Sequence, residues 1–309
     1  NLDDELGVAN MAEYHYDDGS VYGFPTKYEN SRWILINEDM FKEAGLDIPY
    51  DGWTYSEFLA DAEKLTHGEG QDKVYGVCWA RKQSGKSILY ALDGVLGANQ
   101  IYKNEEGTEV NFDNDVYRAG LNLVKETLDK GYAIPIEDEF SEDISVANTF
   151  LQGKCAIMLG VAQMRLCMDQ ENYPHDFMTA LVPEPVPDDE KYNTEFYRKQ
   201  IGTTGAGDLL SISANTKYPE ASFEFAMWYL KGGMSPLVQG GRIPLWNGVN
   251  KDEVLSVLKQ KAQGSIDMDS MENYLSLDTT QGVAAIKGHA SSEISSAWFE
   301  EFDAMCYGK

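Results

Sequence analysis

The sequence has few of the features that identify whole classes of protein. No run of about 18 consecutive apolar residues is present, so the sequence predicts no membrane-spanning helix. Cysteine is scarce: Cys78, Cys155, Cys167 and Cys306 form no CxxC pair, a density far below that of a disulfide scaffold. We expect these four to be free, buried thiols. The four histidines are scattered without ligand spacing, so no zinc site is expected.

Basic residues are also few. Lys and Arg number 25 against 51 Asp and Glu, which gives a net charge of −26. This balance excludes nucleic acid as a partner and disfavours anionic lipid, because both require a basic surface. The excess of acid predicts solubility and weak self-association, and we expect a monomer. Acidic runs at 137–139 and 188–190 are expected in solvated loops.

What is present is an ordinary globular composition, with 43% hydrophobic and 25% charged residues over 309 positions. This length suggests about two domains or one large one. Apolar runs predict strands at 21–25, 33–36, 74–80, 155–159 and 209–212, and a hairpin at 101–112. Helical spacing and turn signals predict helices at 38–44, 54–65, 87–96, 113–128, 141–152, after Gly160, at 219–230 and at 291–305.

Three local signals support these helices. Asn37 and Asp113 are expected N-caps, Thr54 to Glu57 form a capping box, and Pro219 suits a first helical turn. Strands alternating with helices predict α/β layers with a mixed or parallel sheet. Ligands bind such sheets outside the carboxyl ends of the strands. The loops after Phe24, Ala80 and Leu159, and the loop around Gly205, are therefore the candidates for a binding site.

Motifs that carry chemistry are weak. Gly85-Lys86-Ser87 resembles the end of a phosphate-binding loop, but Ala80 stands where the first glycine belongs. No strand ends in an aspartate placed to hold magnesium, so we expect an ordinary loop, with nucleotide binding through Lys86 as an alternative. Neither a nucleophile elbow nor an HExxH motif occurs. The sequence thus predicts no cofactor, no metal and no catalytic residue.

Aromatic residues are plentiful, with six Trp and eighteen Tyr. Sugar rings stack on such side chains, and their hydroxyls bind carboxylates, amides and arginine. Packing in a hydrophobic core is the alternative use of the same aromatics.

Five segments, in order, resemble the family 1 extracellular solute-binding proteins of bacterial ABC importers, the group that contains maltose-binding protein. They are Asp18–Pro25, Leu35–Leu46, Trp53–Phe58, Phe150–Met158 and Ile212–Ser222. The resemblance implies a type II periplasmic-binding-protein-like α/β fold of two lobes. We expect the first lobe, incomplete here, at 1–30 and 205–248, and the second at 31–204 and 249–309.

The resemblance also implies a function. Such a protein captures an extracellular carbohydrate, above all an oligosaccharide, in the cleft between its lobes and delivers it to a membrane permease without catalysing a reaction. It is expected outside the cell or in the periplasm, anchored as a lipoprotein. Family members carry roughly a hundred residues ahead of the first matching segment, a domain's worth. We therefore expect the chain to be a fragment of a longer protein.

The resemblance assigns solute contacts to individual positions. Glu29 stands where the maltose-binding member has a sugar-facing glutamate, with Tyr28 beside it. Gln163 stands where many members have a stacking tryptophan, which puts a stacking platform there in doubt. The full set of expected solute-binding residues is Tyr28, Glu29, Trp79, Arg81, Gln163, Gly205, Arg242, Trp246 and Trp298.

Two further functions remain open at this point. The same fold could bind a polyamine or another cationic solute, which the excess of acid would suit. A glycoside hydrolase also combines aromatics with paired carboxylates, although nothing in the sequence identifies such a pair.

Overall fold

The computed structural model describes residues 19–29, 33–79, 102–104, 106–141, 146–159, 164–199, 205–233, 235–262, 264–276 and 291–308. Its strands are β1 (Phe24–Glu29), β2 (Trp33–Asn37), β3 (Tyr75–Cys78), β4 (Cys155–Leu159), β5 (Thr179–Pro183), β6 (Gly205–Leu210) and β7 (Ile243–Pro244). Its α-helices are α2 (Glu38–Glu43), α3 (Tyr55–Leu65), α6 (Asp115–Asp129), α7 (Ile136–Ser141), α8 (Met164–Cys167), α9 (Glu195–Arg198), α10 (Pro219–Trp228), α11 (Lys251–Ala262), α12 (Met268–Ser276) and α13 (Ser291–Cys306).

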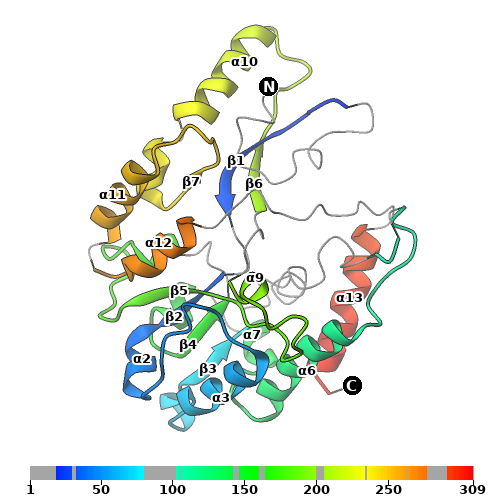
Figure 1. Cartoon of the computed structure of the whole chain (residues 1–309), viewed down its shortest axis with the longest axis vertical. Helices are drawn as coiled ribbons and strands as arrows, with labels where there is room; N and C mark the ends of the chain where they lie inside the picture. The colour runs from blue at the N-terminus through cyan, green and yellow to red at the C-terminus, as the bar shows by residue number, and fades with distance from the viewer. Residues whose placement is uncertain are drawn as a thin grey trace.

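The strands form two sheets, which lie in different parts of the molecule (Figure 1). The larger sheet has the order β3-β4-β2-β5. Strands β3 and β4 are parallel, and β2 is antiparallel to both β4 and β5. Strands β3, β4 and β5 therefore run in one direction, and their carboxyl ends lie at the same edge. The smaller sheet, with the order β6-β1-β7, is antiparallel.

The larger sheet is buried on both faces. Along β2, Trp33 and Leu35 belong to one hydrophobic cluster, and Ile34 and Ile36 belong to the other. Successive side chains of a strand point to opposite faces, so a strand covered on both sides needs apolar residues throughout. This explains the continuous apolar runs at 33–36 and 155–159, and it confirms both predicted strands.

Different helices cover the two faces of the larger sheet. Buried residues of α3, α6 and α13 pack on the face that contains Ile34, and those of α11 and α12 pack on the face that contains Trp33. Side chains around β7, namely Val238, Ile243 and Leu245, belong to the same hydrophobic cluster as Trp33, so the two sheets share this core. A third, small cluster belongs to the smaller sheet. The division into lobes at 30, 204 and 248 stays a prediction.

The helix-start signals act as predicted. The Asn37 side chain accepts a hydrogen bond from the Met40 backbone N–H at 3.1 Å, and Thr54 and Glu57 form both halves of a capping box. Pro219 occupies the first turn of α10. Each device involves atoms three residues apart or fewer, so it forms wherever the chain enters a helix.

Several boundaries differ from prediction. Asn114 caps α6, because its side chain accepts from the Tyr117 N–H, while the predicted cap Asp113 pairs with Arg118 at 2.7 Å. Strand β1 continues through Pro25 to Glu29. A proline fits there because β7 pairs only with Lys27 and Tyr28, which leaves one edge of β1 open at Pro25.

Three other elements also differ. Strand β6 begins at Gly205, where it pairs with Glu29, and not at Leu209. The hairpin predicted at 101–112 reduces, in the described residues, to one bridge between Tyr102 and Val110. Within the helix predicted at 141–152, the described residues are the last residue of α7, Ser141, and a π-helical turn at Val146–Phe150. The helix predicted at 87–96 lies outside the described residues.

All four cysteines are free, as predicted. Cys78, Cys155 and Cys167 are fully buried, while Cys306 is partly exposed, so burial is confirmed for three of them. Burial raises the pKa of the Cys167 thiol to about 12, which leaves almost no reactive thiolate at neutral pH.

Thiol labelling of the native protein should therefore resolve two phases. We expect Cys306 to react first, and the three buried thiols to react at least about 100-fold more slowly, because they react only when the fold opens. Absorbance with a chromogenic disulfide reagent, with and without denaturant, measures both phases. Cys306→Ser should remove the fast phase alone, and three fast thiols would contradict the packing.

In the part of the chain that the structure describes, no helix has the length and apolar character needed to cross a membrane. Nor do the described residues contain a group of three or more His, Cys, Asp and Glu side chains placed to hold a metal ion.

Helix α3 carries one carboxyl group, Asp61, whose surroundings disfavour its ionised form. Asp61 is half-buried, and this burial raises its pKa from 3.8 to about 6, against a smaller opposite effect of Lys64. Because the folded state then binds the proton more tightly than the unfolded chain, the stability linked to Asp61 is lost as pH rises from about 4 through 6.

Asp61→Asn should therefore raise the free energy of unfolding at pH 7.5 by about 1 kcal/mol. This value is smaller than the full pKa shift would give, because solvent screens the exposed half of the side chain. At pH 4 the variant and the parent should be equally stable. Urea unfolding at the two pH values measures this, with the exposed Asp72→Asn as the matched control. An equal gain at both pH values would contradict it.

Candidate functional site

The carboxyl ends of β3, β4 and β5 meet at one edge of the larger sheet, and a small, partly open hollow of about 20 Å³ lies there. It is lined by Ile34, Tyr55, Phe58, Trp79, Gly120, Leu123, Val124, Leu159, Glu184 and Pro185. The space inside holds about one water molecule, so the hollow could take a hydroxyl or methyl group of a ligand but not a sugar ring.

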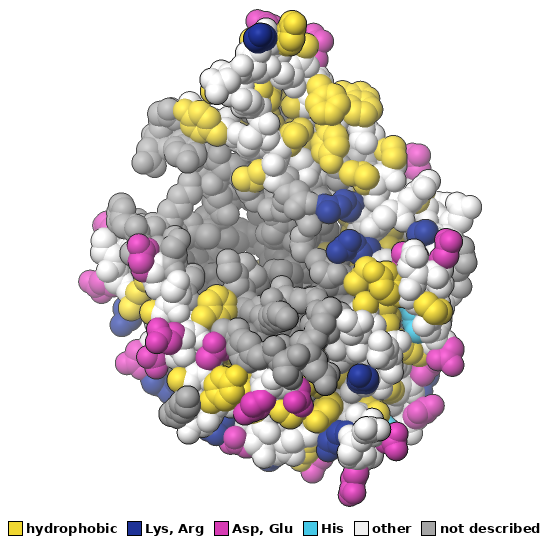
Figure 2. Space-filling view, turned by 180° about the vertical axis from the view of Figure 1, so that it is seen from behind, with side chains coloured by type: hydrophobic (Ala, Val, Ile, Leu, Met, Phe, Trp, Pro, Cys, Tyr) yellow, Lys and Arg dark blue, Asp and Glu magenta, His cyan; other side chains and the backbone are white. Residues whose placement is uncertain are grey.

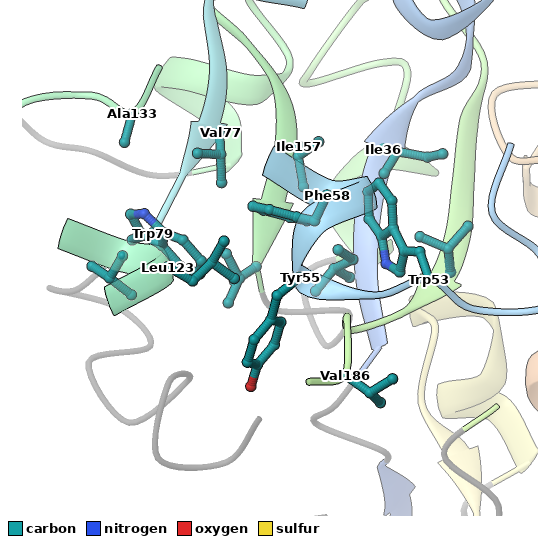
Figure 3. Packing of buried hydrophobic residues seen from close by; sticks show 14 of the residues in the cluster. Ile36, Trp53, Tyr55, Phe58, Val77, Trp79, Leu123, Ala133, Ile157 and Val186 are labelled. Carbon is teal, nitrogen blue, oxygen red and sulfur yellow. The ribbon is translucent and has the colours of Figure 1, made fainter. Parts of the chain in front are cut away.

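Trp79 follows β3 directly and forms part of the wall. Its indole Nε1–H donates to Thr127 Oγ1 at 2.9 Å, and its ring lies 5.7 Å from that of Phe58. Figure 3 shows the ring among Leu123 and Phe58, and it is 7% exposed. The Trp79 ring therefore packs within the hydrophobic cluster. Stacking of a solute on this ring stays a prediction.

Glu184 is the residue at this edge that the sequence analysis missed. It follows β5 directly, is 1% exposed and lines an otherwise apolar hollow beside Tyr55. Burial, and to a smaller extent the charge of Glu184, raises the pKa of the Tyr55 hydroxyl. An acidic residue between two prolines immediately after an apolar strand was the available signal.

The backbone around Glu184 is fixed by contacts distant in sequence. The Tyr55 N–H donates to the Val186 carbonyl at 2.8 Å, and the Val186 N–H donates to the Trp53 carbonyl at 3.0 Å. These bonds join the segment after β5 to the start of α3. Figure 3 shows Val186 beside Tyr55, whose hydroxyl points away from the cluster.

The smaller sheet brings together a second group of predicted residues. Its register pairs Glu29 with Gly205, and Tyr28 with both Ala206 and Ile243. Arg242 immediately precedes Ile243, so four predicted positions lie on adjacent stretches of backbone. Trp246 lies two residues after β7.

The Trp246 ring packs closely over Gly248, where an added Cβ would come within 2.5 Å of the indole. Trp246 and Arg242 are both partly exposed. The residues on either side of β7 therefore present a cationic and an aromatic side chain beside the smaller sheet. This combination can bind a polar ligand that has an apolar face.

The remaining predicted residues are placed differently. Trp298 on α13 is 8% exposed and stacks on Phe302, with ring centroids 5.1 Å apart and planes at 10°. It lies in the same hydrophobic cluster as Trp79. Arg81, Gln163 and Lys86 lie outside the described residues. The structure thus gathers Tyr28, Glu29, Gly205 and Arg242 at one sheet, and places Trp79 and Trp298 in the core beside the other.

The family model for bacterial extracellular solute-binding proteins matches residues 2–231, which is most of the chain. The chain belongs to this family. Among curated protein sequences, none matches it significantly.

Solved structures of solute-binding proteins resemble this one. An ABC substrate-binding protein from Listeria monocytogenes in complex with cycloalternan has 17% identity and a TM-score of 0.71, and the match covers 100% of this chain and 71% of that chain. A sugar transporter from Rhizobium etli has 18% identity and a TM-score of 0.67, over 98% and 71% of the two chains. The GacH receptor of Streptomyces glaucescens has 16% identity and a TM-score of 0.65, over 100% and 71%.

These likenesses show that the solute-binding protein has the α/β fold of type II periplasmic-binding proteins, as predicted. The family and these neighbours are binding proteins and not enzymes, and the family is extracellular by description.

Proposed function

We propose that this solute-binding protein captures a carbohydrate, above all an oligosaccharide, and delivers it to the membrane permease of an ABC importer. The observation that carries the proposal is the shared fold with proteins whose described ligands are carbohydrates or polyols. Structures with nearly the same fold are described with cycloalternan, acarbose, cyclic α-maltosyl-1,6-maltose and D-mannitol. The family match over most of the chain supports capture without a reaction.

The two groups of residues suggest how capture works. In this proposal the solute contacts Tyr28, Glu29, Gly205, Arg242 and Trp246 at the smaller sheet, and Trp79 and Trp298 at the larger one. Arg81 and Gln163, which lie outside the described residues, complete the proposed set of contacts. A solute that touches both groups favours the arrangement in which they are close, and the permease recognises that arrangement. The protein acts as a monomer outside the cell or in the periplasm, held by a lipoprotein anchor.

A thermal-shift screen with mono- and oligosaccharides tests the proposal. We expect one class of sugar to raise the melting temperature with concentration, because a ligand at 100 times its Kd stabilises the folded state by about 2.7 kcal/mol. Trp246→Ala should weaken that ligand at least about tenfold by calorimetry, whereas the matched control Tyr307→Ala, exposed after α13, should not. A screen in which no sugar shifts the melting temperature would contradict the proposal.

A cationic solute is the second candidate. The net charge of −26 and the carboxylate of Glu184 at the hollow favour it. Spermidine and spermine belong in the same screen, and a shift of the melting temperature with these alone would replace the carbohydrate proposal.

Chromogenic glycosides test the hydrolase alternative, and we expect no turnover over a day.

A further inference from the structure

Tyr55, the first residue of α3, combines a buried ring with an accessible hydroxyl. The residue is only 7% exposed, and it lines the hollow at the edge of the larger sheet. Among the described residues, no group forms a hydrogen bond with its hydroxyl. The hydroxyl oxygen is also not one of the enclosed polar atoms of the described chain, so it reaches solvent. Polar groups on such buried residues normally have a partner, so this hydroxyl indicates a place for a ligand.

The Tyr55 ring is held in one position by the structure around it. Its backbone N–H donates to the Val186 carbonyl at 2.8 Å, and Thr54 and Glu57 form the capping box that begins the helix. The ring belongs to the same hydrophobic cluster as Phe58, and Figure 3 shows the hydroxyl pointing away from that cluster. A hydroxyl on a fixed ring loses little conformational freedom when it binds a ligand, so its hydrogen bond contributes to affinity.

The edge that carries Tyr55 adjoins the group of proposed contacts at the smaller sheet. Glu29 ends β1, and Trp33 begins β2 four residues later. Four residues of extended chain span at most about 14 Å, so Glu29 lies within that distance of Trp33. Ile34, the next residue, lines the same hollow as Tyr55. An oligosaccharide can bridge a separation of this order, so one solute can reach both Glu29 and Tyr55.

The charges around the hydroxyl indicate which solute group it meets. Burial, and after it the carboxylates of Glu184 and Asp188, raise the pKa of Tyr55. The hydroxyl therefore stays protonated at neutral pH and can donate a hydrogen bond. The same two carboxylates disfavour an anionic acceptor, because like charges repel. A neutral hydroxyl oxygen, as in an uncharged sugar, is the acceptor that fits.

The overall acidity of the protein carries no such local information. Figure 2 shows Asp and Glu side chains spread over the face that it draws, interspersed with Lys and Arg and not gathered at one place. A net charge of −26 distributed in this way favours solubility. The groups beside Tyr55 therefore say more about the solute than the total charge does.

We propose that Tyr55 is a further solute-binding residue, whose hydroxyl donates a hydrogen bond to a neutral hydroxyl of the bound carbohydrate. This inference rests on the proposed function and adds to it one contact, at the edge of the larger sheet, that selects an uncharged sugar group.

Tyr55→Phe tests this contact, because it removes the hydroxyl and keeps the ring. Calorimetry uses maltotriose, isomaltotriose, cellotriose and D-mannitol as probes. For the tightest of these, we expect the Kd to rise about tenfold, the effect of one lost hydrogen bond. The unfolding equilibrium constant without sugar should change less than about threefold, because the described residues lose no hydrogen bond.

Tyr75→Phe is the matched control. Tyr75 begins β3, so it lies at the opposite edge of the larger sheet from the hollow, and it is also partly buried. Loss of its hydroxyl should change the Kd of the same probe less than about twofold, because sites that share no contacts act independently.

Monodeoxy derivatives of the tightest probe identify the hydroxyl that Tyr55 binds. The derivative that lacks this hydroxyl should bind the parent about tenfold more weakly than the complete sugar. It should bind Tyr55→Phe and the parent equally, because the hydrogen bond is already absent. For every other derivative, the loss of affinity should be the same in both proteins.

Two results would overturn the role of Tyr55 while the proposed function stands. The first is a probe that binds the parent and Tyr55→Phe equally well. The second is weaker binding to Tyr55→Phe in which every monodeoxy derivative loses the same affinity as it does with the parent, which would show that the hydroxyl acts only through the fold. Binding of no probe to the parent would instead contradict the proposed function, and this inference with it.

Discussion

Replacement of Gly76 by alanine should lower the free energy of unfolding by about 3 kcal/mol. Gly76 lies in β3, directly beneath α3. A Cβ added there would lie 2.7 Å from Ala62 Cα and 2.8 Å from the Ala62 carbonyl carbon, closer than atoms can approach. The obstacle is helix backbone and not a flexible side chain, so α3 as a whole would have to move.

Other contacts prevent such a movement. The Gly76 N–H donates to Thr66 Oγ1 at 2.9 Å, and Thr66 Oγ1 donates to the Ala62 carbonyl at 2.7 Å. Ala62 is fully buried, and Phe58 and Leu65 of the same helix pack in the cluster beneath it. Shifting α3 would loosen all of these, so the strain cannot be relieved locally.

Urea unfolding followed by circular dichroism measures the effect. Gly240→Ala is the matched control, because nothing lies within 4 Å of a Cβ added there, and we expect a change within about 0.5 kcal/mol. A Gly76→Ala variant as stable as this control would show that β3 and α3 do not approach so closely.

Trp33→Ala should cost about 4 kcal/mol, while Trp33→Phe should stay within about 1 kcal/mol of the parent. Trp33 is fully buried at the start of β2, and its ring meets Tyr274 of α12 edge to face, with centroids 5.3 Å apart. Truncation to alanine leaves a cavity between β2 and α12. Phenylalanine keeps an aromatic ring in the same place.

The small cost of phenylalanine follows from the indole nitrogen. Among the described residues, Trp33 Nε1 has no hydrogen-bond acceptor, although it is buried. A buried N–H without a partner costs about 1–3 kcal/mol, and phenylalanine removes it. This gain offsets part of the lost ring area.

Urea unfolding of the two variants separates ring packing from hydrogen bonding at one position. The expected gap between them is about 3 kcal/mol. If phenylalanine proves as costly as alanine, then the Nε1–H makes a hydrogen bond that stabilises the fold, and ring packing is not the main contribution of this residue.

These two predictions concern the fold that holds the proposed site. Gly76 lies three residues before Trp79, and Trp33 precedes Ile34, which lines the hollow. A variant at either position that remained folded with an altered sugar affinity would show that the packing of the larger sheet supports solute binding.

Local sequence was sufficient for the features that depend on neighbouring residues. The Asn37 cap and the Thr54–Glu57 capping box each join atoms at most three positions apart. The run Cys155–Leu159 predicted a strand buried on both faces because every position in it is apolar. The ordered family segments, together with these patterns, were enough for the fold class and the family.

The site could be predicted only in part. Sequence reasoning placed the candidate loops at the carboxyl ends of strands, and the hollow lies at such an edge; that reasoning named Trp79 there and did not name Glu184. Glu184 reaches the hollow because Val186 bonds to Trp53 and Tyr55, more than 130 positions earlier. No short-range pattern carries such a pairing.

Pairing between distant segments also explains the other features that sequence reasoning could not assign. Glu29 lies beside Gly205 through strand register, Trp298 is buried because α13 packs on the same cluster as α6, and Gly76 matters because α3 crosses β3 closely. Residue type and spacing determine caps, strand burial and helix faces, because those interactions are local. Which faces meet depends on the packing of the whole chain, because hydrophobic attraction has no direction and many pairings bury similar area.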